Sequence, residues 1–146
     1  MYFLFSSDFK EQTEYFLDMV GLTKFQEYYP RQLSASMLQR ASIARAFAVR
    51  PEVLLMDEPY GQLDVELRFK LEDELIRLWR EVGTTVIFIT HNIEEAVYLS
   101  ERILVLTNKP TKIKAEIPNN LPRPRDIAAP EFVALRNQVT DLIKWW

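Results

Sequence analysis

The sequence predicts an α/β fold with a mostly parallel sheet, flanking helices and a C-terminal helix. Segments with the apolar spacing of helices alternate with short apolar runs, a pattern that favours layered α/β architecture. The runs at 53–56 (VLLM) and 84–90 (TTVIFIT) are almost continuously apolar, as expected of strands buried on both faces of a parallel sheet. The chain also begins in helices and offers few strands, which is typical of the back part of a larger α/β domain.

Two helices are expected first. Residues 8–20 carry apolar side chains at a spacing that suits one helix face, and Gly21 follows as a stop signal. A second helix, with Ser34 or Ser36 as its cap, is expected to run to about Val49. This second segment is rich in alanine, so a neighbouring element can approach it closely.

The remaining elements follow the first apolar run. A long amphipathic helix is expected over 65–82, and a short helix over 92–100. Two strands, at 102–107 and 112–117, are close enough along the chain to form an antiparallel edge of the sheet. A proline-rich link then leads to a last amphipathic helix, expected over 131–146.

Composition excludes several kinds of site. The 146 residues contain no cysteine, which rules out disulfides, thiolate metal sites and thiol nucleophiles. The formal net charge is −3 and no lysine or arginine cluster is present, which argues against nucleic acid or an anionic membrane as the main partner. No apolar stretch approaches the length of a membrane span, so any work at a membrane would require docking on a partner.

Three polar residues follow the predicted strands. Asp57 and Glu58 come directly after the first strand, and His91, the only histidine, follows the second. Ligands in open α/β sheets bind beyond the carboxyl ends of the strands, so these side chains are expected to converge there. One carboxylate can hold Mg²⁺ while the other orients or deprotonates a water molecule. A structural ion pair with a capping histidine is the alternative interpretation.

Four stretches, taken in order, resemble motifs of the ATP-binding subunit of ABC transporters. LSASMLQR is similar to that family's signature motif, VLLMDEP to its Walker B strand, GQLD to its D-loop and ITHNIEEA to its H-loop. The flanking YYPRQLS and IPNNLPRPRD are most similar to the nitrate, sulfonate and taurine importer branch. The resemblance covers nearly the whole chain and implies part of a P-loop NTPase domain, namely its C-terminal portion.

The resemblance also implies roles for single residues. Asp57 would belong to the magnesium shell, and Glu58 would be the general base. His91 would contact the γ-phosphate of ATP, and Asp64 would help to form a dimer contact. On this reading, Glu58 and His91 carry the catalysis.

The signature residues would serve the partner's nucleotide. Ser34, Ala35, Ser36 and Gln39 would lie towards the γ-phosphate of ATP held by a second ATP-binding subunit in a head-to-tail dimer. Transmembrane permease subunits would couple the dimer to transport, at the cytoplasmic face of the cell membrane. Neither nucleic acid nor a membrane span of the chain's own is expected.

The sequence departs from this family in two ways. It contains no G-x-x-x-x-G-K-[ST] loop to cradle the phosphates, and the usual signature glycines are replaced by Ala35 and Ser36. If either position required φ > 0, the side chain would cost on the order of 1–2 kcal/mol. ATP and Mg²⁺ are therefore expected only together with the missing half or a partner subunit, and we expect no tight ATP binding by this chain alone.

Three functional hypotheses remain at this point. The first is a portion of an importer ATPase, divided into a helical remnant (1–31), the signature and Walker B core (32–117) and the link with its helix (118–146). The second is a non-catalytic interaction module that docks on complete transporter subunits. The third is an unrelated magnesium-dependent phosphate enzyme. Whether the chain is itself an enzyme is left open, because Walker A is absent.

Overall fold

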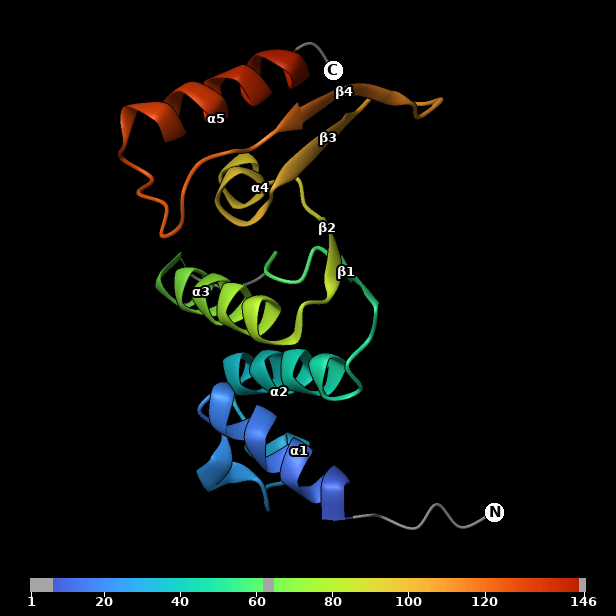
Figure 1. Cartoon of the computed structure of the whole chain (residues 1–146), viewed down its shortest axis with the longest axis vertical. Coiled ribbons are helices and arrows are strands. Elements are labelled where there is room, and N and C mark those ends of the chain that lie inside the picture. The colour runs from blue at the N-terminus through green and yellow to red at the C-terminus, as the bar shows by residue number, and fades with distance from the viewer. Residues whose placement is uncertain (1–6, 62–64, 145–146) are drawn as a thin grey trace. The chain divides into compact units, whose positions relative to one another are not determined.

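The computed structural model describes residues 7–61 and 65–144, with side chains from Lys10 onward (Figure 1). It contains two compact units, of which the N-terminal unit ends at Ile87 and the C-terminal unit begins at Phe88. We describe each unit by itself. The division into segments 1–31, 32–117 and 118–146 follows motifs rather than compactness, and it stays a prediction.

Three helices build most of the N-terminal unit. Gly21 has φ +68°, and its N–H bonds to the carbonyl of Asp18, so the predicted stop after the first helix is confirmed. Ser34 caps the second helix, as expected. The helices are α1 (Ser7–Met19), α2 (Ala35–Ala48) and α3 (Val65–Val82), with short 3₁₀ turns at η1 (Thr23–Phe25) and η2 (Pro30–Gln32).

The core of this unit lies between the three helices. Helix α2 packs against both α1 and α3. Leu71, Leu75 and Leu78 of α3 are buried, which confirms the apolar face predicted for this helix. The other buried apolar side chains of the unit are Phe16, Val20, Leu22, Ile43, Ala44, Phe47, Met56 and Tyr60.

Strands β1 (Val53–Asp57) and β2 (Thr85–Ile89) form a two-stranded sheet, and α3 connects them. The N–H of Thr85 bonds to the carbonyl of Glu52 at 2.9 Å, so the two strands start side by side. The Thr84 hydroxyl donates to the carbonyl of Pro51, also at 2.9 Å, at the same end. A helical crossover between strands that begin together gives the parallel pair that the sequence predicts.

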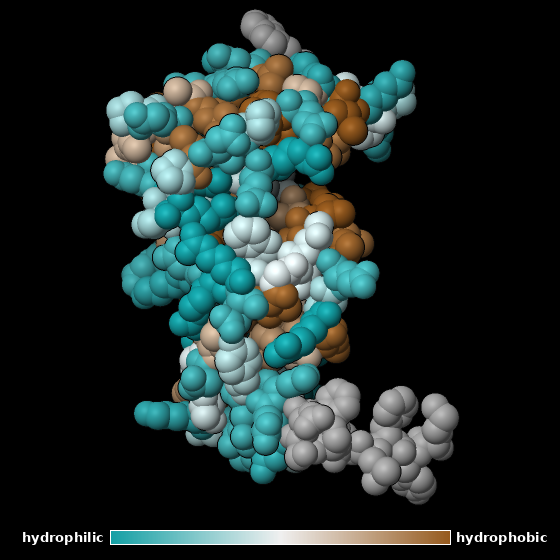
Figure 2. Space-filling model, viewed as in Figure 1, coloured by the Kyte–Doolittle hydropathy of each residue, from teal (hydrophilic) through white to brown (hydrophobic). Residues whose placement is uncertain are grey.

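One face of this sheet is uncovered, so the prediction of strands buried on both faces is wrong. Val53, Leu55 and Ile87 are 53%, 71% and 50% exposed, whereas Met56 is buried. Figure 2 shows apolar side chains gathered over β1 and β2. The physical reason is that a continuously apolar run makes both faces suitable for burial. Whether both are covered depends on other elements.

The C-terminal unit is an antiparallel pair of strands with two helices. Its elements are α4 (Ile93–Leu99), β3 (Arg102–Leu106), β4 (Ile113–Pro118) and α5 (Pro130–Ile143). Ile103 pairs with Ile117 and Leu104 with Glu116, which confirms the antiparallel arrangement. The pair forms a two-stranded sheet of its own rather than the predicted edge of a larger sheet.

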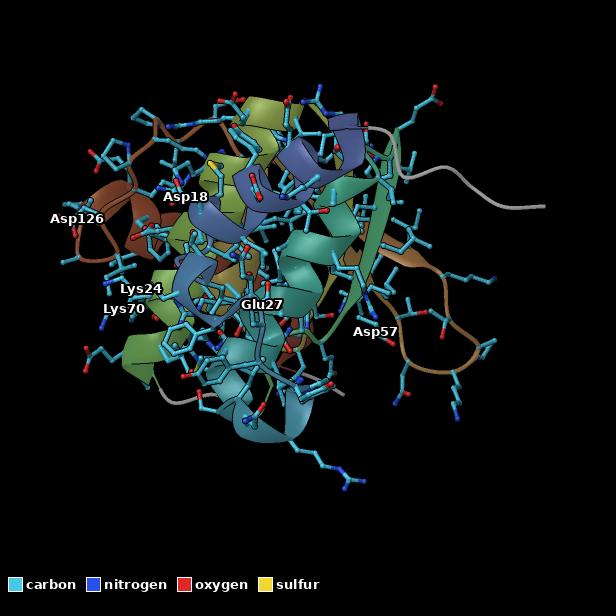
Figure 3. The ribbon with its side chains drawn as sticks, turned by 90° about the horizontal axis from the view of Figure 1, so that it is seen from below. Asp18, Lys24, Glu27, Asp57, Lys70 and Asp126 are labelled. Carbon is cyan, nitrogen blue, oxygen red and sulfur yellow. The ribbon has the colours of Figure 1, made fainter. Side chains whose placement is uncertain are left out.

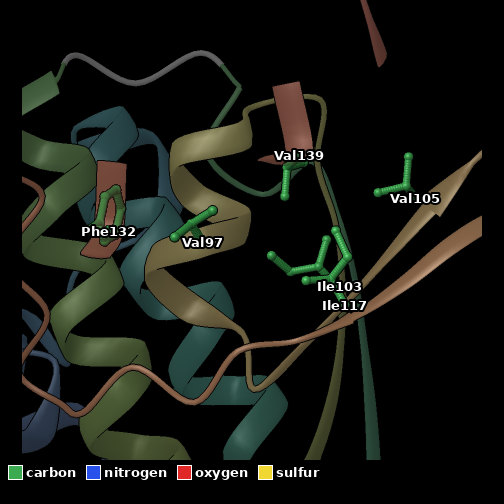
Figure 4. Close-up of a cluster of buried hydrophobic side chains, with 6 residues drawn as sticks. All are labelled: Val97, Ile103, Val105, Ile117, Phe132 and Val139. Carbon is green, nitrogen blue, oxygen red and sulfur yellow. The ribbon is translucent and has the colours of Figure 1, made fainter. Parts of the chain in front are cut away.

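An apolar cluster holds this unit together (Figure 4). Helices α4 and α5 pack against each other, and α5 also contacts β3. Every second residue of β3 is buried, which is the alternation expected of a sheet with one covered face. The buried members of the cluster are Val97, Ile103, Val105, Ile117, Phe132 and Val139.

Arg125, from the proline-rich link, closes the C-terminal end of α4. Its side chain is only 8% exposed. Its Nη1 donates to the carbonyl oxygens of Val97, Tyr98 and Ser100 at 2.9, 2.8 and 2.7 Å. Burial, together with the nearby charge of Arg123, lowers the pKa of Arg125 to about 10. The last carbonyls of a helix have no partner within it, and here Arg125 supplies one together with Asn119, which donates to the Val97 carbonyl, and Arg123, which donates to that of Leu99.

Candidate functional site

Asp57 and Glu58 stand at the carboxyl end of β1. Asp57 is the last residue of the strand, and Figure 3 shows it at one end of β1. Both side chains are exposed, so neither carboxylate bears the cost of burial that an apolar run before it suggests. Two exposed acids at the carboxyl end of a parallel strand lie where ligands of α/β sheets bind.

Glu58 has a backbone conformation that side chains rarely adopt. Its φ is +43°, and its carbonyl accepts from the N–H of Gly61 at 3.3 Å, which closes a tight turn after the strand. A left-handed residue other than glycine costs on the order of 1–2 kcal/mol. Strain of this kind gathers at functional sites, so Glu58 is a site candidate on geometric grounds as well as chemical ones.

The signature segment begins α2. The Ser34 hydroxyl accepts from the N–H of Met37 at 3.3 Å and lies 3.0 Å from the Ser36 hydroxyl. Ala35 and Ser36 are helical, and among the described residues only Arg50 and Glu58 are non-glycine residues with positive φ. The strain considered for the two missing glycines is therefore not present. What remains is the bulk of two side chains where glycine would leave the helix end open.

Ser34, Ala35, Ser36 and Gln39 share the first turns of α2, with Ser34 and Ala35 exposed. Unpaired N–H groups at a helix start attract anions. In this helix, the Ser34 oxygen already takes the N–H of Met37. The role of these four residues at a partner's nucleotide stays a prediction.

His91 belongs to the C-terminal unit, just before α4, and its side chain is exposed. Asp57 and Glu58 belong to the N-terminal unit, so the predicted convergence of the three side chains stays a prediction. Asp64 lies outside the described residues. The structure therefore brings together Asp57 with Glu58, and Ser34 with Ala35 and Ser36, within one unit.

Sequence reasoning missed the polar side chains around His91. Thr90, Asn92 and Glu95 form a hydrogen-bonded group on either side of it. Asn92 could have been found, because asparagine before an acidic first turn is a strong helix-start signal. The bond between Thr90 and Glu95 spans five residues and follows no common pattern.

The acidic residues suit a magnesium ion better than a caged metal. No group of three or more His, Asp or Glu side chains that could enclose a metal occurs among the described residues. Mg²⁺ is usually bound by one or two carboxylates, with water and substrate phosphates completing the shell. The exposed carboxylate of Asp57 fits that requirement.

A protein-family model described as ABC transporter matches residues 4–61. An ABC transporter ATP-binding protein of Methanocaldococcus jannaschii is 46% identical over 129 residues, which cover 88% of this chain and 48% of the relative. The chain thus spans about half the length of the curated relatives it matches. No helix in the described part is long and apolar enough to cross a membrane.

Two further relatives carry more specific names. An aliphatic sulfonates import ATP-binding protein of Bacillus cereus is 43% identical over 130 residues, covering 89% of this chain and 52% of the relative. A nitrate import ATP-binding protein of Synechococcus elongatus is 40% identical over 145 residues, covering 96% of this chain and 53% of the relative.

A solved structure agrees on the fold. An ATP-binding cassette of an ABC transporter, in its ADP conformation, superposes with a TM-score of 0.75 at 17% identity, covering 99% of this chain and 53% of that one. The sequence similarity to ABC transporter ATP-binding proteins sets aside an unrelated magnesium-dependent phosphate enzyme. The chain belongs to the ATP-binding proteins of ABC transporters, and it carries part of their P-loop NTPase cassette.

Proposed function

We propose that the chain is the part of an ABC importer's ATP-binding subunit that carries the hydrolytic acids, and that it is inactive alone. The observation that carries this proposal is the end of β1, where two exposed carboxylates follow a parallel strand and the second occupies a strained turn. The similarity to nitrate and sulfonate import proteins supports solutes of that kind, or taurine-like ones.

Glu58 acts as the general base in this proposal. Its carboxylate orients the attacking water and accepts the proton that the water loses. The turn closed by Gly61 holds the backbone of Glu58, so the carboxylate is presented from a fixed position. A Cβ at position 61 would lie 3.7 Å from one Glu58 carboxylate oxygen, which is an ordinary van der Waals contact, so Gly61 lies directly beside the carboxylate.

Asp57 holds the metal side of the site. Bound Mg²⁺ would neutralise charge on the phosphate oxygens. The exposed Asp57 carboxylate supplies a ligand of the oxygen type that this ion takes. His91 contacts the γ-phosphate, and Asp64 contributes to the dimer contact. The acids and the histidine thus divide the work among metal, water and phosphate.

A second ATP-binding subunit and paired permease subunits are the proposed partners. Ser34, Ala35, Ser36 and Gln39 lie at the start of α2, and in a head-to-tail dimer they would meet the nucleotide of the opposite subunit. The proposed location is cytoplasmic, peripheral at the inner face of the cell membrane. The names of the relatives as import ATP-binding proteins support this arrangement.

The absence of a phosphate-cradling loop in the 146 residues sets the first test. Calorimetric titration of the purified chain with Mg-ATP is expected to give no binding at micromolar concentrations, because nothing in the sequence holds the β- and γ-phosphates. Micromolar binding by the chain alone would contradict this part of the proposal.

The second test supplies the rest of the cassette. A chain that joins the N-terminal half of the Bacillus cereus relative to these 146 residues is expected to hydrolyse ATP. In that chain, Glu58→Gln should lower kcat by at least about a hundredfold, since it removes the base but keeps the shape. Glu52→Gln, an exposed change before β1, is the matched control. Equal activity of Glu58→Gln and the control would refute the role of Glu58.

The alternative is an interaction module that docks on complete transporter subunits. The uncovered apolar face at Val53, Leu55 and Ile87 favours it, because exposed apolar patches mark docking surfaces. If adding the unmodified chain lowers the ATPase rate of the complete Bacillus cereus relative, that result supports the interaction module. If Leu55→Lys abolishes that inhibition, the sheet face is the docking surface.

A further inference from the structure

His91 lies between two residues whose polar atoms are tied to the first turn of α4. The hydroxyl of Thr90 donates to Oε2 of Glu95 at 2.6 Å and accepts from the N–H of Asn92 at 2.9 Å. The side-chain oxygen of Asn92 accepts from the N–H groups of Glu94 and Glu95, at 2.9 and 3.3 Å. The backbone is therefore fixed on both sides of His91.

The bond between Thr90 and Glu95 is not needed to start the helix. Asn92 alone provides the side-chain acceptor for the first N–H groups of α4, which is the whole task of an N-cap. The Thr90 hydroxyl lies one residue before His91, outside the helix. What its bond to Glu95 adds is a link between the end of the strand and the helix, across the histidine.

Glu95 is placed to make that link firm. It is only 5% exposed, and its carboxylate lies at a short distance from the Thr90 hydroxyl, as in hydrogen bonds to charged acceptors. A buried carboxylate whose hydrogen bond is broken is costly, so the group resists opening. The neighbouring Glu94 instead forms an ion pair with Arg136 of α5, at 3.9 Å. The first turn of α4 is thus held on two sides.

We propose that Glu95 is a positioning residue for His91 and acts through Thr90. The carboxylate fixes the Thr90 hydroxyl, the hydroxyl fixes the peptide N–H of Asn92, and the His91 backbone between them has one conformation. The exposed imidazole is thereby presented from a rigid base. The use of that rigidity rests on the proposed function, in which His91 contacts a phosphate and must be preorganised to do so.

The experiment uses the imidazole of His91 as its own reporter. Because it is the only histidine, histidine-selective ¹⁵N and ¹³C labelling of the full chain gives one set of backbone and ring signals, and a second, uniformly ¹⁵N- and ¹³C-labelled sample reports the apolar cluster. Thr90→Val removes the hydroxyl and keeps the shape, Glu95→Met removes the acceptor, and Thr90→Ser is the conservative variant. Thr140→Val is the matched control, since Thr140 forms an ordinary hydroxyl bond to the Arg136 carbonyl within α5.

We expect one sharp set of His91 signals in the unmodified chain, Thr90→Ser and Thr140→Val. In Thr90→Val and Glu95→Met, we expect a lower backbone order parameter at His91 or a second set of signals, while the signals of Val97, Ile103 and Val139 in the apolar cluster stay in place. That difference separates positioning from folding. If Thr90→Val also shifts the cluster signals, that variant has disturbed the fold, and the result for Glu95→Met decides whether the proposal holds.

Unchanged order at His91 in the deciding variant would overturn the proposal, and so would a loss of order that appears only together with loss of the cluster signals. The readout needs no nucleotide. Ordered His91 with no effect of His91→Ala on ATPase activity in the joined chain would refute the proposed function instead. The two failures are therefore distinguishable.

Discussion

Arginine side chains close one helix end in each unit, in different electrostatic surroundings. In the N-terminal unit, Arg40 of α2 donates to the Val20 carbonyl at 2.8 Å, and Arg77 of α3 donates to the Met19 carbonyl. These two arginines come from separate helices, and the charges of both lower the pKa of the nearby Glu74 carboxyl, against the larger effect of burial. The end of α1 is thus held by its tertiary neighbours.

In the C-terminal unit, both arginines come from the proline-rich link. Arg125 takes three carbonyls at the end of α4, and Arg123 donates to the Leu99 carbonyl. The two like charges lie near each other, and Arg125 is nearly buried. The comparison shows that hydrogen bonds from arginine to helix-end carbonyls join packed helices in one unit and attach an irregular link to a helix in the other. In the link, much more depends on a single side chain.

The largest expected effect is the loss of Arg125. Arg125→Met should lower the free energy of unfolding of the C-terminal unit by about 3 kcal/mol, because it removes the guanidinium from the carbonyls of Tyr98 and Ser100 and leaves the Val97 carbonyl to Asn119. Amide hydrogen exchange at Val97 and Ile103 in the full chain would measure this loss unit by unit.

Arg102→Met is the matched control for Arg125→Met. Arg102 is exposed and pairs with Glu116 at the surface, so its loss should change stability by less than about 0.5 kcal/mol. Arg77→Met should fall between the two, because Arg40 still holds the neighbouring carbonyl. Equal losses for Arg125→Met and Arg77→Met would break the comparison.

The next effect concerns strain, which among the described residues is found on both sides of β1. Arg50 and Glu58 have φ of +45° and +43°. Glycine adopts this region without strain, so Arg50→Gly and Glu58→Gly should each raise the stability of the N-terminal unit by about 1 kcal/mol. Glu58→Gln keeps its Cβ and should bring no gain. Denaturant unfolding of the three variants would show whether strain is held at Glu58 for its chemistry.

The smallest effect depends on pH. Burial raises the pKa of the Glu74 carboxyl, against the opposing charges of Arg40 and Arg77. A raised folded-state pKa means that the stabilising contribution is present below the ordinary value of 4.5 and is lost as pH rises through the folded value. Glu74→Gln stays neutral, so its stability relative to the unmodified chain should improve between about pH 4 and pH 7.

The gain for Glu74→Gln should be a few tenths of a kcal/mol, since the group is only half-buried and water screens it. Parallel urea titrations at both ends of the pH range would measure it. A constant difference across that range would show that the arginines cancel the effect of burial on this pKa, and a difference that moves against Glu74→Gln as pH rises would show that they outweigh it.

The sequence predicted the elements well, because their signals are local. Helix α3 has the expected bounds at Val65 and Val82, and Ser34 caps α2 as expected. The family followed from four ordered motifs. These signals are patterns of residues that are neighbours along the chain, so they can be read from one sequence without knowing its three-dimensional contacts.

What the sequence did not reveal depends on neighbours in space. The exposed face at Leu55 reflects which elements cover a sheet, and the apolar run does not encode that. The left-handed residue of the turn after β1 is Glu58 rather than a glycine, so the sequence does not mark that conformation. The hydrogen bonds of Arg125 join residues 25 or more apart along the chain, so no periodic pattern in the sequence predicts them. The candidate site was thus predictable in its residues but not in its backbone geometry.

The hydrogen bonds of Arg125 to the end of α4 also affect how readily a protease cleaves the link. An arginine- and proline-rich link with little regular structure suggests an easy target for trypsin. Trypsin must draw an arginine side chain into its own pocket, yet the guanidinium of Arg125 is occupied by backbone carbonyls of α4. Cleavage after Arg125 should therefore require local opening of the link. The cleavage rate would then report the fraction of molecules in which Arg125 is detached from α4.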